Sequence, residues 1–486
     1  MLNFCRAGGY PVYVLCLLLV AYLLNQLDRY ILAVVIQPVA QDLGFGDKSC
    51  LANLTESHVT EYCNNGSNEI ECLSLLDAKG TRTCKWDYNG NGWEYQVMAG
   101  PVFVLVYTFM GIFVGCLADG ANRKVLLSAS LMVWSLMTCL MGFVREYWQL
   151  GALRFGQGIG EAGCTPFAVS LIADYFPETA RGSAMGFYNW GIYMGYSLAF
   201  AVGTYATRAD IMGMGWRGAF LLSGLPGFAV ALLVLVSVRE PPRKHRPGEE
   251  SAPPGQNLLQ RLGPQLRPFL SPALLLLCLA GSVRNAGGYV WAYNVQNYFS
   301  LYFPQVDMGR WLSWIPLVGG SLGVLFGGFV SDRVVKRRGL TARVWVLVIS
   351  QVLASPFLLG ALWLRPPYAF LMLIPAYIIG EMWVGVALAI VVELVPSSVR
   401  TSAVAVYLFI ITNIGGSAPL LVAPLSALCG LRGALILLYP GAYLTGSVLF
   451  LATLCVIRRG WPKPDSEDLE PLLQEPEPGP EDKKST

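Results

Sequence analysis

Apolar stretches long enough to cross a lipid bilayer recur along the whole chain, and this pattern restricts the fold more than any other feature. A membrane-spanning helix needs about 20 mostly apolar residues. Since 54% of the 486 residues are hydrophobic and only 13% are charged, most of the chain suits lipid better than water. In hydrocarbon a helix satisfies its own backbone hydrogen bonds. We therefore expect an all-α membrane protein with twelve spans, at residues 11–36, 97–118, 125–143, 148–173, 183–206, 218–238, 271–299, 309–331, 341–363, 367–392, 401–425 and 434–457.

Basic residues gather in alternate connections between these spans. They are Arg123, Lys124, Arg243, Lys244, Arg246, Lys336, Arg337, Arg338, Arg458 and Arg459. Connections rich in Lys and Arg stay on the cytosolic side of a membrane, so we predict that both termini are cytosolic. The first span runs on without a small-residue cleavage site, which favours a signal anchor over a removable signal peptide.

The long connection 41–96 would then face a lumen or the cell exterior. It contains two glycosylation sequons and four cysteines: Asn53, Asn65, Cys50, Cys63, Cys72 and Cys84. An even set of cysteines beside sequons predicts N-glycosylation and two disulfides formed in an oxidising compartment. The sequence leaves three pairings open. The eight other cysteines lack the spacing of metal ligands, and we expect no metal and no cofactor.

The chain repeats itself across residues 239–268, a segment rich in proline, glycine and charge. Asp119 after the second span is matched by Asp332 after the eighth, and Arg181 after the fourth span by Arg400 after the tenth. The two offsets are 213 and 219 residues. We therefore predict two six-helix bundles, 1–238 and 269–457, joined by a cytosolic linker, 239–268, and followed by a polar tail, 458–486.

These repeated motifs resemble the signature of the major facilitator superfamily, a Gly followed by three residues, an Asp and basic residues. Gly115 with Asp119 and Gly328 with Asp332 fit it, although Gly120 stands where the family usually has a basic residue. The resemblance covers almost the whole chain outside the long loop, linker and tail, and implies two halves that rock around a central site.

Carboxylates at these helix ends would hold cytosolic arginines while the opposite side is open. The residues expected to form this gating latch are Asp119, Arg123, Arg181, Asp332, Arg333 and Arg400. The alternative is that these charges only obey the orientation rule. The repeated spacing favours the latch.

Ionisable side chains inside the predicted spans are costly and mark functional sites. Those near mid-depth are Asp28 and Arg29 in the first span, Arg154 and Glu161 in the fourth, Arg284 in the seventh and Glu381 in the tenth. Arg154 and Glu161 are seven residues apart and share one helix face. The two glutamates lie 220 apart, at related places in the repeat. The alternative is that buried ion pairs merely tie helices together.

If transport is coupled to protons, a carboxylate must bind and release the proton. His58 and His245, the only histidines, fall outside the predicted spans. Burial favours the protonated form of a carboxyl group whereas a neighbouring arginine favours the charged form. Asp28 and Glu161, each beside an arginine in the sequence or on the same helix face, are therefore the expected proton carriers.

The run from Asn25 to Asp28-Arg29, together with Arg154 and Glu161, resembles the Spinster branch of the superfamily. Its members are described as proton-linked or facilitative exporters of lysophospholipids and sphingoid lipid phosphates. The resemblance implies that these four charged residues form the proton and substrate switch. Organic-anion symporters have a similar fourth helix, so a small organic anion or sugar acid is the second substrate class. The cysteine-bearing loop departs from the Spinster pattern.

The seventh span mixes one cation with amides and aromatic rings. Arg284, Asn285 and Tyr289 flank a diglycine, and such a set suits an anionic head group with an apolar body. Aromatic residues near a membrane interface are the alternative for Trp291 and Tyr293, but this alternative does not explain Arg284, which lies about two turns deeper.

The polar tail carries Asp468, Leu472 and Leu473 in the pattern of an acidic dileucine signal, which clathrin adaptors recognise. We therefore expect a lysosomal or late endosomal membrane, with the plasma membrane second. No phosphate loop, nucleophile elbow or soluble catalytic domain occurs, so we expect no enzyme. Basic residues are confined to short loops, which argues against nucleic-acid binding. We expect a monomer, and a non-transporting receptor with the same fold is the further alternative.

Overall fold

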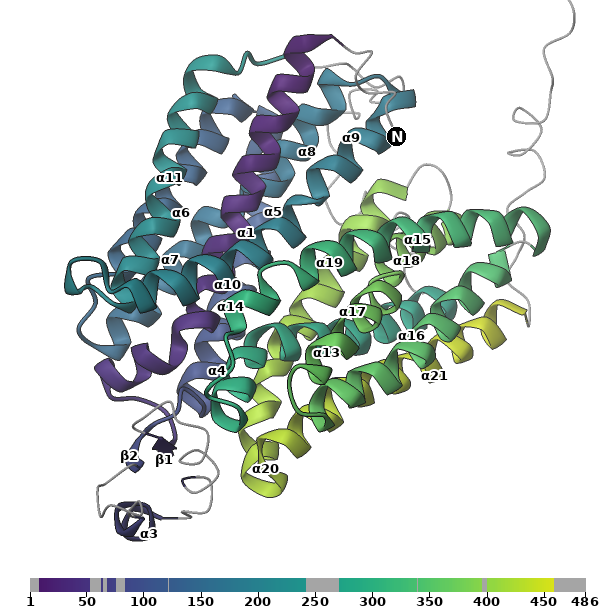
Figure 1. Ribbon diagram of the computed structural model, residues 1–486. Helices are drawn as coiled ribbons and strands as arrows, with labels where there is room; N and C mark the ends of the chain where they lie inside the picture. The colour runs from purple at the N-terminus through teal and green to yellow at the C-terminus, as the bar shows by residue number, and fades with distance from the viewer. Residues whose placement is uncertain are drawn as a thin grey trace, which may run out of the picture.

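The computed structural model describes residues 8–52, 63, 68–75, 84–120, 122–241, 271–338, 340–395 and 400–458. Its helices form two bundles (Figure 1): the N-half runs from α1 to α11 and the C-half from α13 to α21. The halves meet near α4, α10 and α14 and diverge toward the end that carries the N-terminus.

The N-half comprises α1 Gly9–Leu43, β1 Lys48–Ala52, α3 Glu69–Ser74, β2 Cys84–Tyr88, α4 Trp93–Ala99, α5 Pro101–Gly120, α6 Arg123–Met141, α7 Tyr147–Glu161, α8 Cys164–Tyr175, α9 Glu178–Asn189, α10 Gly191–Ala209, η2 Ile211–Gly213 and α11 Trp216–Ser237. The C-half comprises α13 Pro272–Tyr302, α14 Met308–Leu312, α15 Ile315–Arg338, α16 Leu340–Trp363, α17 Tyr368–Gly380, α18 Trp383–Leu394, α19 Arg400–Ser417, η5 Ala418–Leu421, α20 Val422–Leu438 and α21 Pro440–Arg458.

Each of the twelve predicted spans coincides with helix. Nine helical stretches of the described residues are long and apolar enough to cross a membrane. The second, fourth and fifth spans are each built from two shorter helices, α4 with α5, α7 with α8, and α9 with α10. The fourth and tenth spans are interrupted at equivalent places, because α7 ends at Glu161 and α17 ends one residue before Glu381. The two acids of the sequence repeat therefore stand at helix breaks.

We call the end of the molecule that carries Gly9 and Arg458 the terminus side, and the opposite end the loop side. Across the interface between the halves, α1 packs on α13, α5 on α19, and α10 on both α14 and α15. Two glycines allow a close approach of the backbones: a Cβ added to Gly100, between α4 and α5, would lie 2.9 Å from the carbonyl oxygen of Gly416 in α19. These contacts close the loop side of the interface.

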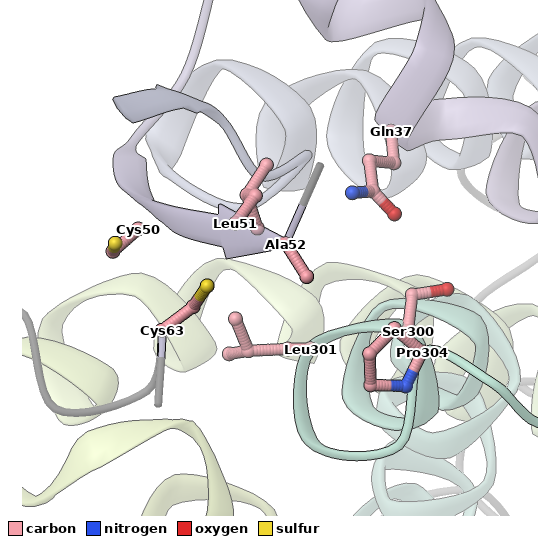
Figure 2. A pocket seen from close by; sticks show the side chains of 8 residues that line it. All are labelled: Gln37, Cys50, Leu51, Ala52, Cys63, Ser300, Leu301 and Pro304. Atoms are coloured by element: carbon pink, nitrogen blue, oxygen red, sulfur yellow. The ribbon is translucent and has the colours of Figure 1, made fainter. Parts of the chain in front are cut away.

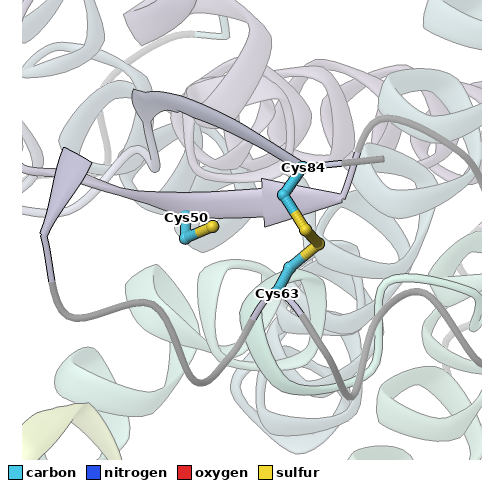
Figure 3. Close-up of side chains that lie close together, drawn as sticks. All are labelled: Cys50, Cys63 and Cys84. Atoms are coloured by element: carbon cyan, nitrogen blue, oxygen red, sulfur yellow. A yellow bond between two sulfur atoms is a disulfide. The ribbon is translucent and has the colours of Figure 1, made fainter. Parts of the chain in front are cut away.

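A two-stranded antiparallel hairpin, β1 with β2, projects from the loop side (Figure 1). Disulfides join Cys50 to Cys72 and Cys63 to Cys84, which is one of the three pairings the sequence left open. Figure 3 shows the Cys63–Cys84 bond beside Cys50, and the sulfur atoms of these three residues lie within 4.8 Å of one another. Since all three are in disulfides, none is a metal ligand.

Candidate functional site

The charged groups of α1 and α7 meet at the interface between the halves. The guanidinium of Arg29 donates from Nε and Nη2 to Oε2 of Glu161, at 3.2 and 3.0 Å. Arg29 is 7% exposed and Glu161 is fully buried. Gly160 brings α7 close to α6, since a Cβ there would lie 2.7 Å from the backbone nitrogen of Trp134. This close packing fixes where Glu161 stands.

Arg154, two turns before Glu161 on α7, joins the same cluster. Its Nη1 donates to Gln157 Oε1 at 2.8 Å, and Gln157 in turn donates to Glu161 Oε1 at 2.8 Å. Both terminal nitrogens also reach the carbonyl oxygen of Arg29, at 3.3 and 3.4 Å. Among the described residues, Arg154 Nε has no hydrogen-bond partner, and the guanidinium of Arg154 forms no ion pair. The cluster therefore contains two buried guanidiniums and one carboxylate.

Asp28 points to a different face of α1. Its carboxylate lies against Trp134 and Thr138 of α6 and Ser223 of α11. It is 1% exposed, and neither oxygen has a hydrogen bond of ordinary geometry among the described residues. The indole nitrogen of Trp134 and the hydroxyl of Thr138 are also buried without a partner. The structure thus brings together three of the four charges predicted to confront one another and places Asp28 behind them.

The C-half holds a second buried ion pair. Arg284 Nη2 donates to Glu381 Oε1 at 3.1 Å and to the carbonyl oxygen of Gly380 at 2.6 Å, and its Nε donates to Gln351 at 3.1 Å. The guanidinium also lies 4.5 Å from the ring centres of both Trp383 and Tyr443. Nε and Nη2 of this guanidinium are therefore hydrogen-bonded, and two aromatic rings pack against it.

The N-half reaches this second pair through one residue. Tyr193 of α10 donates its hydroxyl proton to Glu381 Oε2 at 3.3 Å. It sits where α15 has a glycine, because a Cβ on Gly320 would overlap the Tyr193 ring at 2.2 Å. Tyr193 is a residue that the sequence analysis missed, because nothing in the sequence distinguishes it from the other tyrosines of the same span.

Aromatic rings cover the Arg29 cluster. The guanidinium carbon of Arg29 lies 5.0 Å from the ring centre of Phe103 and 4.6 Å from that of Tyr107, both on α5. From the C-half, Tyr289 lies beside Arg29 and stacks on Tyr293 at 6.0 Å. The α5 rings were not predicted, although their spacing of four residues puts them on one helix face.

Asn285 and Trp291, also of α13, have structural partners. The amide of Asn285 donates to the carbonyl oxygen of Ile411 in α19 at 3.0 Å, so it ties α13 to α19 within the C-half. Trp291 is 2% exposed and stacks on Tyr439 at 4.8 Å. Trp291 is therefore a packed core residue rather than an interfacial anchor.

On the terminus side, the predicted latch residues have partners within their own half. Arg123 pairs with Asp174 at 2.5 Å and with Glu240 at 2.7 Å. Arg181 donates to the carbonyl oxygen of Ala173 at 2.8 Å. The sequence analysis did not identify Asp174 or Glu240 as partners of Arg123, because neither lies near it in sequence.

The C-half has a comparable terminus-side pair. Arg343 Nε lies 2.8 Å from Glu393 Oε1, and Arg343 also donates to Ser331 at 2.7 Å. Glu393 is the repeat counterpart of Asp174. Arg333 lies over the ring of Phe329 at 5.6 Å. The side chains of Asp119, Asp332 and Arg400 lie outside the described residues, as do Asn53, Asn65, Asp468, Leu472 and Leu473.

One pocket lies away from all these charges. It opens on the loop side between the hairpin and the end of α13 (Figure 2), where Leu51 and Ala52 face Ser300, Leu301 and Pro304. None of the membrane-buried charges lines it.

Comparison with known families decides the class. The family model of the Major Facilitator Superfamily matches residues 18–420. The chain belongs to this superfamily. Its fold is therefore twelve spanning helices in two pseudo-symmetric six-helix bundles, as predicted, and it is a membrane transporter rather than an enzyme.

Relatives of this superfamily member narrow the branch. It is 28% identical over 374 residues to a protein of Mycolicibacterium smegmatis named MFS-type efflux pump, which covers 73% of this chain and 82% of the relative. It is 22% identical over 356 residues to a protein of Arabidopsis thaliana named probable sphingolipid transporter spinster homolog 1, which covers 65% of this chain and 67% of that one.

A solved structure agrees with this branch. The crystal structure of a bacterial homolog of the human lysosomal transporter Spinster, in an inward-facing and unoccupied conformation, superposes with a TM-score of 0.66 at 25% identity. The match covers 93% of this chain and 96% of that one. The superfamily member described here therefore resembles the Spinster branch, as its first and fourth spans predicted.

Proposed function

We propose that this protein is a secondary transporter that works by alternating access and exports an anionic lysolipid or sphingolipid-like molecule. One observation carries the proposal: among the described residues, Arg154 is a buried cation without an ion pair, beside the paired Arg29 and Glu161. An isolated buried charge is costly, and inside a membrane such a charge is usually kept for a substrate or ion. An anionic head group would supply the missing partner.

The surroundings of Arg29 favour a cargo with an apolar body. The rings of Phe103, Tyr107 and Tyr289 surround the charged cluster from both halves. Aromatic faces stabilise a nearby cation and also pack against apolar chains. A small sugar acid would use the arginines but has no long apolar chain to pack against these rings. The relative named as a sphingolipid transporter points the same way.

Proton coupling is the second part of the proposal, and it rests on Asp28 rather than on Glu161. Glu161 is neutralised by Arg29, whereas Asp28 has no ion-pair partner among the described residues, and its carboxylate lies against the neutral donors of Trp134, Thr138 and Ser223. Burying an unpaired carboxylate costs more than burying a neutral carboxyl group. Asp28 would therefore take up a proton in one conformation and release it in another.

For orientation and location we propose that the terminus side is cytosolic and that the loop side faces the lumen of a lysosome or late endosome. The distribution of Lys and Arg favours this orientation, and two disulfides suit an oxidising lumen. Treatment with a glycosidase should increase the electrophoretic mobility of the unchanged chain but not that of an Asn53→Gln/Asn65→Gln double variant. This result would place the loop on the luminal side. Mobility equal in both forms would contradict it.

The transport proposal is tested in liposomes that contain the purified chain. We expect uptake of a fluorescent lysophosphatidic acid or sphingosine phosphate, accelerated by a pH gradient, and loss of uptake in Arg154→Gln. Arg145→Gln, which changes an exposed arginine before α7, is the matched control and should transport normally. Uptake of gluconate-like acids instead of lipids would support the small-anion alternative. Flux of neither class would support the receptor.

A further inference from the structure

The loop-side hairpin follows α1 in the chain and so belongs to the N-half, yet it is bonded to the C-half. The amide nitrogen of Asn297 in α13 donates to the carbonyl oxygen of Gly90 at 2.6 Å and to Asn91 Oδ1 at 3.2 Å. Asn297 is 1% exposed. The buried amide nitrogen of one half is therefore bonded to a loop of the other half, through one backbone and one side-chain oxygen.

The loop is also seated closely on α1. Gly90 has a φ of +78°, and a Cβ there would lie 3.1 Å from the Cα of Gln37 and 3.3 Å from Asn297 Oδ1. Gln41, one turn further along α1, donates to the carbonyl oxygen of Tyr88 at 3.1 Å. Gly90 thus lies wedged between α1 and α13, where a side chain would not fit.

The contact continues deeper along the same face of α13. One turn below Asn297, Asn294 Oδ1 accepts from Gln96 of α4 at 2.6 Å. Beside it the hydroxyl of Tyr95 donates to the carbonyl oxygen of Tyr293. Asn294, Gln96 and Tyr95 are fully buried. Polar bonds at successive depths therefore hold α13 against the N-half on the loop side, and the hairpin is the outermost of them.

The hairpin itself is braced. Asp47 and Asn91 continue the pairing beyond β1 and β2, with Asp47 N donating to the carbonyl oxygen of Asn91 at 3.0 Å. The two disulfides tie each strand to the chain between them. A braced hairpin moves as one body, so breaking its contact with Asn297 would release the whole loop from α13.

We propose that residues 44–52 and 84–92, which we name the loop-side clasp, hold the loop side shut and detach from α13 when that side opens. The bonds suit a reversible closure, because amide hydrogen bonds exchange with water at small net cost. Neither Asn297 nor Gly90 carries a charge that would be stranded by opening. This inference rests on the alternating access of the proposed function.

The first test measures access from the loop side and needs no substrate. A Tyr289→Cys reporter is placed at the interface, in a chain whose eight cysteines outside the loop are replaced by serine. Sealed vesicles with the loop side outward are treated with a membrane-impermeant maleimide. Asn297→Ala removes both hydrogen bonds to the clasp, and we expect it to raise the labelling rate by at least about fivefold. Gln296→Ala is the matched control, because the Gln296 amide donates to Ser300 of its own helix and, among the described residues, forms no hydrogen bond to the N-half.

The second test traps the clasp instead of weakening it. In an Asn91→Cys/Asn297→Cys double variant the two thiols would face each other where the amides now meet at 3.2 Å. We expect micromolar Cd²⁺ to abolish loop-side labelling of the reporter and a chelator to restore it, with neither single variant affected. Cd²⁺ is used because a reductant would also open the native disulfides.

The outcomes separate the two ideas. Unchanged labelling in Asn297→Ala, together with no effect of Cd²⁺ on the double variant, would overturn the clasp. A reporter that is never labelled from the loop side in any variant, although it is labelled from the terminus side, would instead count against alternating access itself.

Discussion

The two buried ion pairs stand at related helices of the two halves but differ in how completely they are satisfied. In the C-half, Arg284 is bonded to Glu381, Gln351 and a backbone carbonyl and lies against two aromatic rings. In the N-half, among the described residues, Arg154 Nε is buried without a hydrogen-bond partner, and neither Arg154 nor Asp28 forms an ion pair. Buried charges are normally paired. Among the charged groups of these two clusters, the unpaired ones lie in the N-half, where we expect binding and proton exchange.

The difference also assigns separate tasks to residues that look alike in the sequence. A pair that is fully bonded holds helices together, and its loss is buffered by the remaining bonds. A cluster that contains an unpaired charge can bind an ion or a charged substrate. We therefore expect the C-half pair to act as a support and the N-half cluster to act as the switch.

The largest expected effect compares Glu161→Gln with Glu381→Gln. Removing one partner of a buried ion pair costs about 3–5 kcal/mol, so Glu161→Gln should reduce the initial rate of uptake by at least about 100-fold. Arg284 keeps its other bonds in Glu381→Gln, and we expect a fall of about tenfold. Melting temperatures in detergent would control for folding. Equal losses in the two variants would break the comparison.

A smaller effect is expected for Asp28→Asn, and it should be selective. An amide avoids the cost of an unpaired buried carboxylate, so the free energy of unfolding should stay within about 1 kcal/mol of the unchanged chain or rise. Stimulation by a pH gradient should disappear while exchange without a gradient stays within about twofold. Uptake measured at several imposed gradients would decide. If a pH gradient still stimulated uptake in Asp28→Asn, Glu161 would instead be the expected proton carrier.

The smallest effect concerns the contact between the switch half and the support half. Tyr193→Phe removes one hydrogen bond to Glu381, worth about 1 kcal/mol, and should change the uptake rate by about two- to fivefold. Tyr205→Phe, at an exposed ring of the same helix, is the matched control. A change as large as that of Glu161→Gln would mean that the C-half pair takes part directly in binding.

Hydropathy predicted the spans because each must cover the same bilayer thickness, and the cost of buried charge singled out Arg29, Arg154 and Glu161. The environment of Asp28 could not be read in the same way. Neighbouring residues on a helix point about 100° apart, and α1 is buried nearly all round, so its pattern does not reveal its rotation. Only packing against α6 and α11 determines that Asp28 turns away from Arg29.

Other features depend on contacts between distant segments. Arg123 pairs with Glu240, 117 residues away, at the start of the segment that leaves the N-half. In the sequence Asn297 is one of several amides in the seventh span, and only the structure shows that the hairpin lies beside it. Neither relation leaves a local pattern, so both required the structure.

The interruptions of the fourth and tenth spans have a mechanical consequence. Glu161 and Glu381 stand where their helices bend, each with a rigid rod extending toward either membrane surface. A carboxylate at such a fulcrum is displaced least when the rods swing. Each acid can thus keep hold of its arginine through a movement that carries the ends of the same span through much larger arcs.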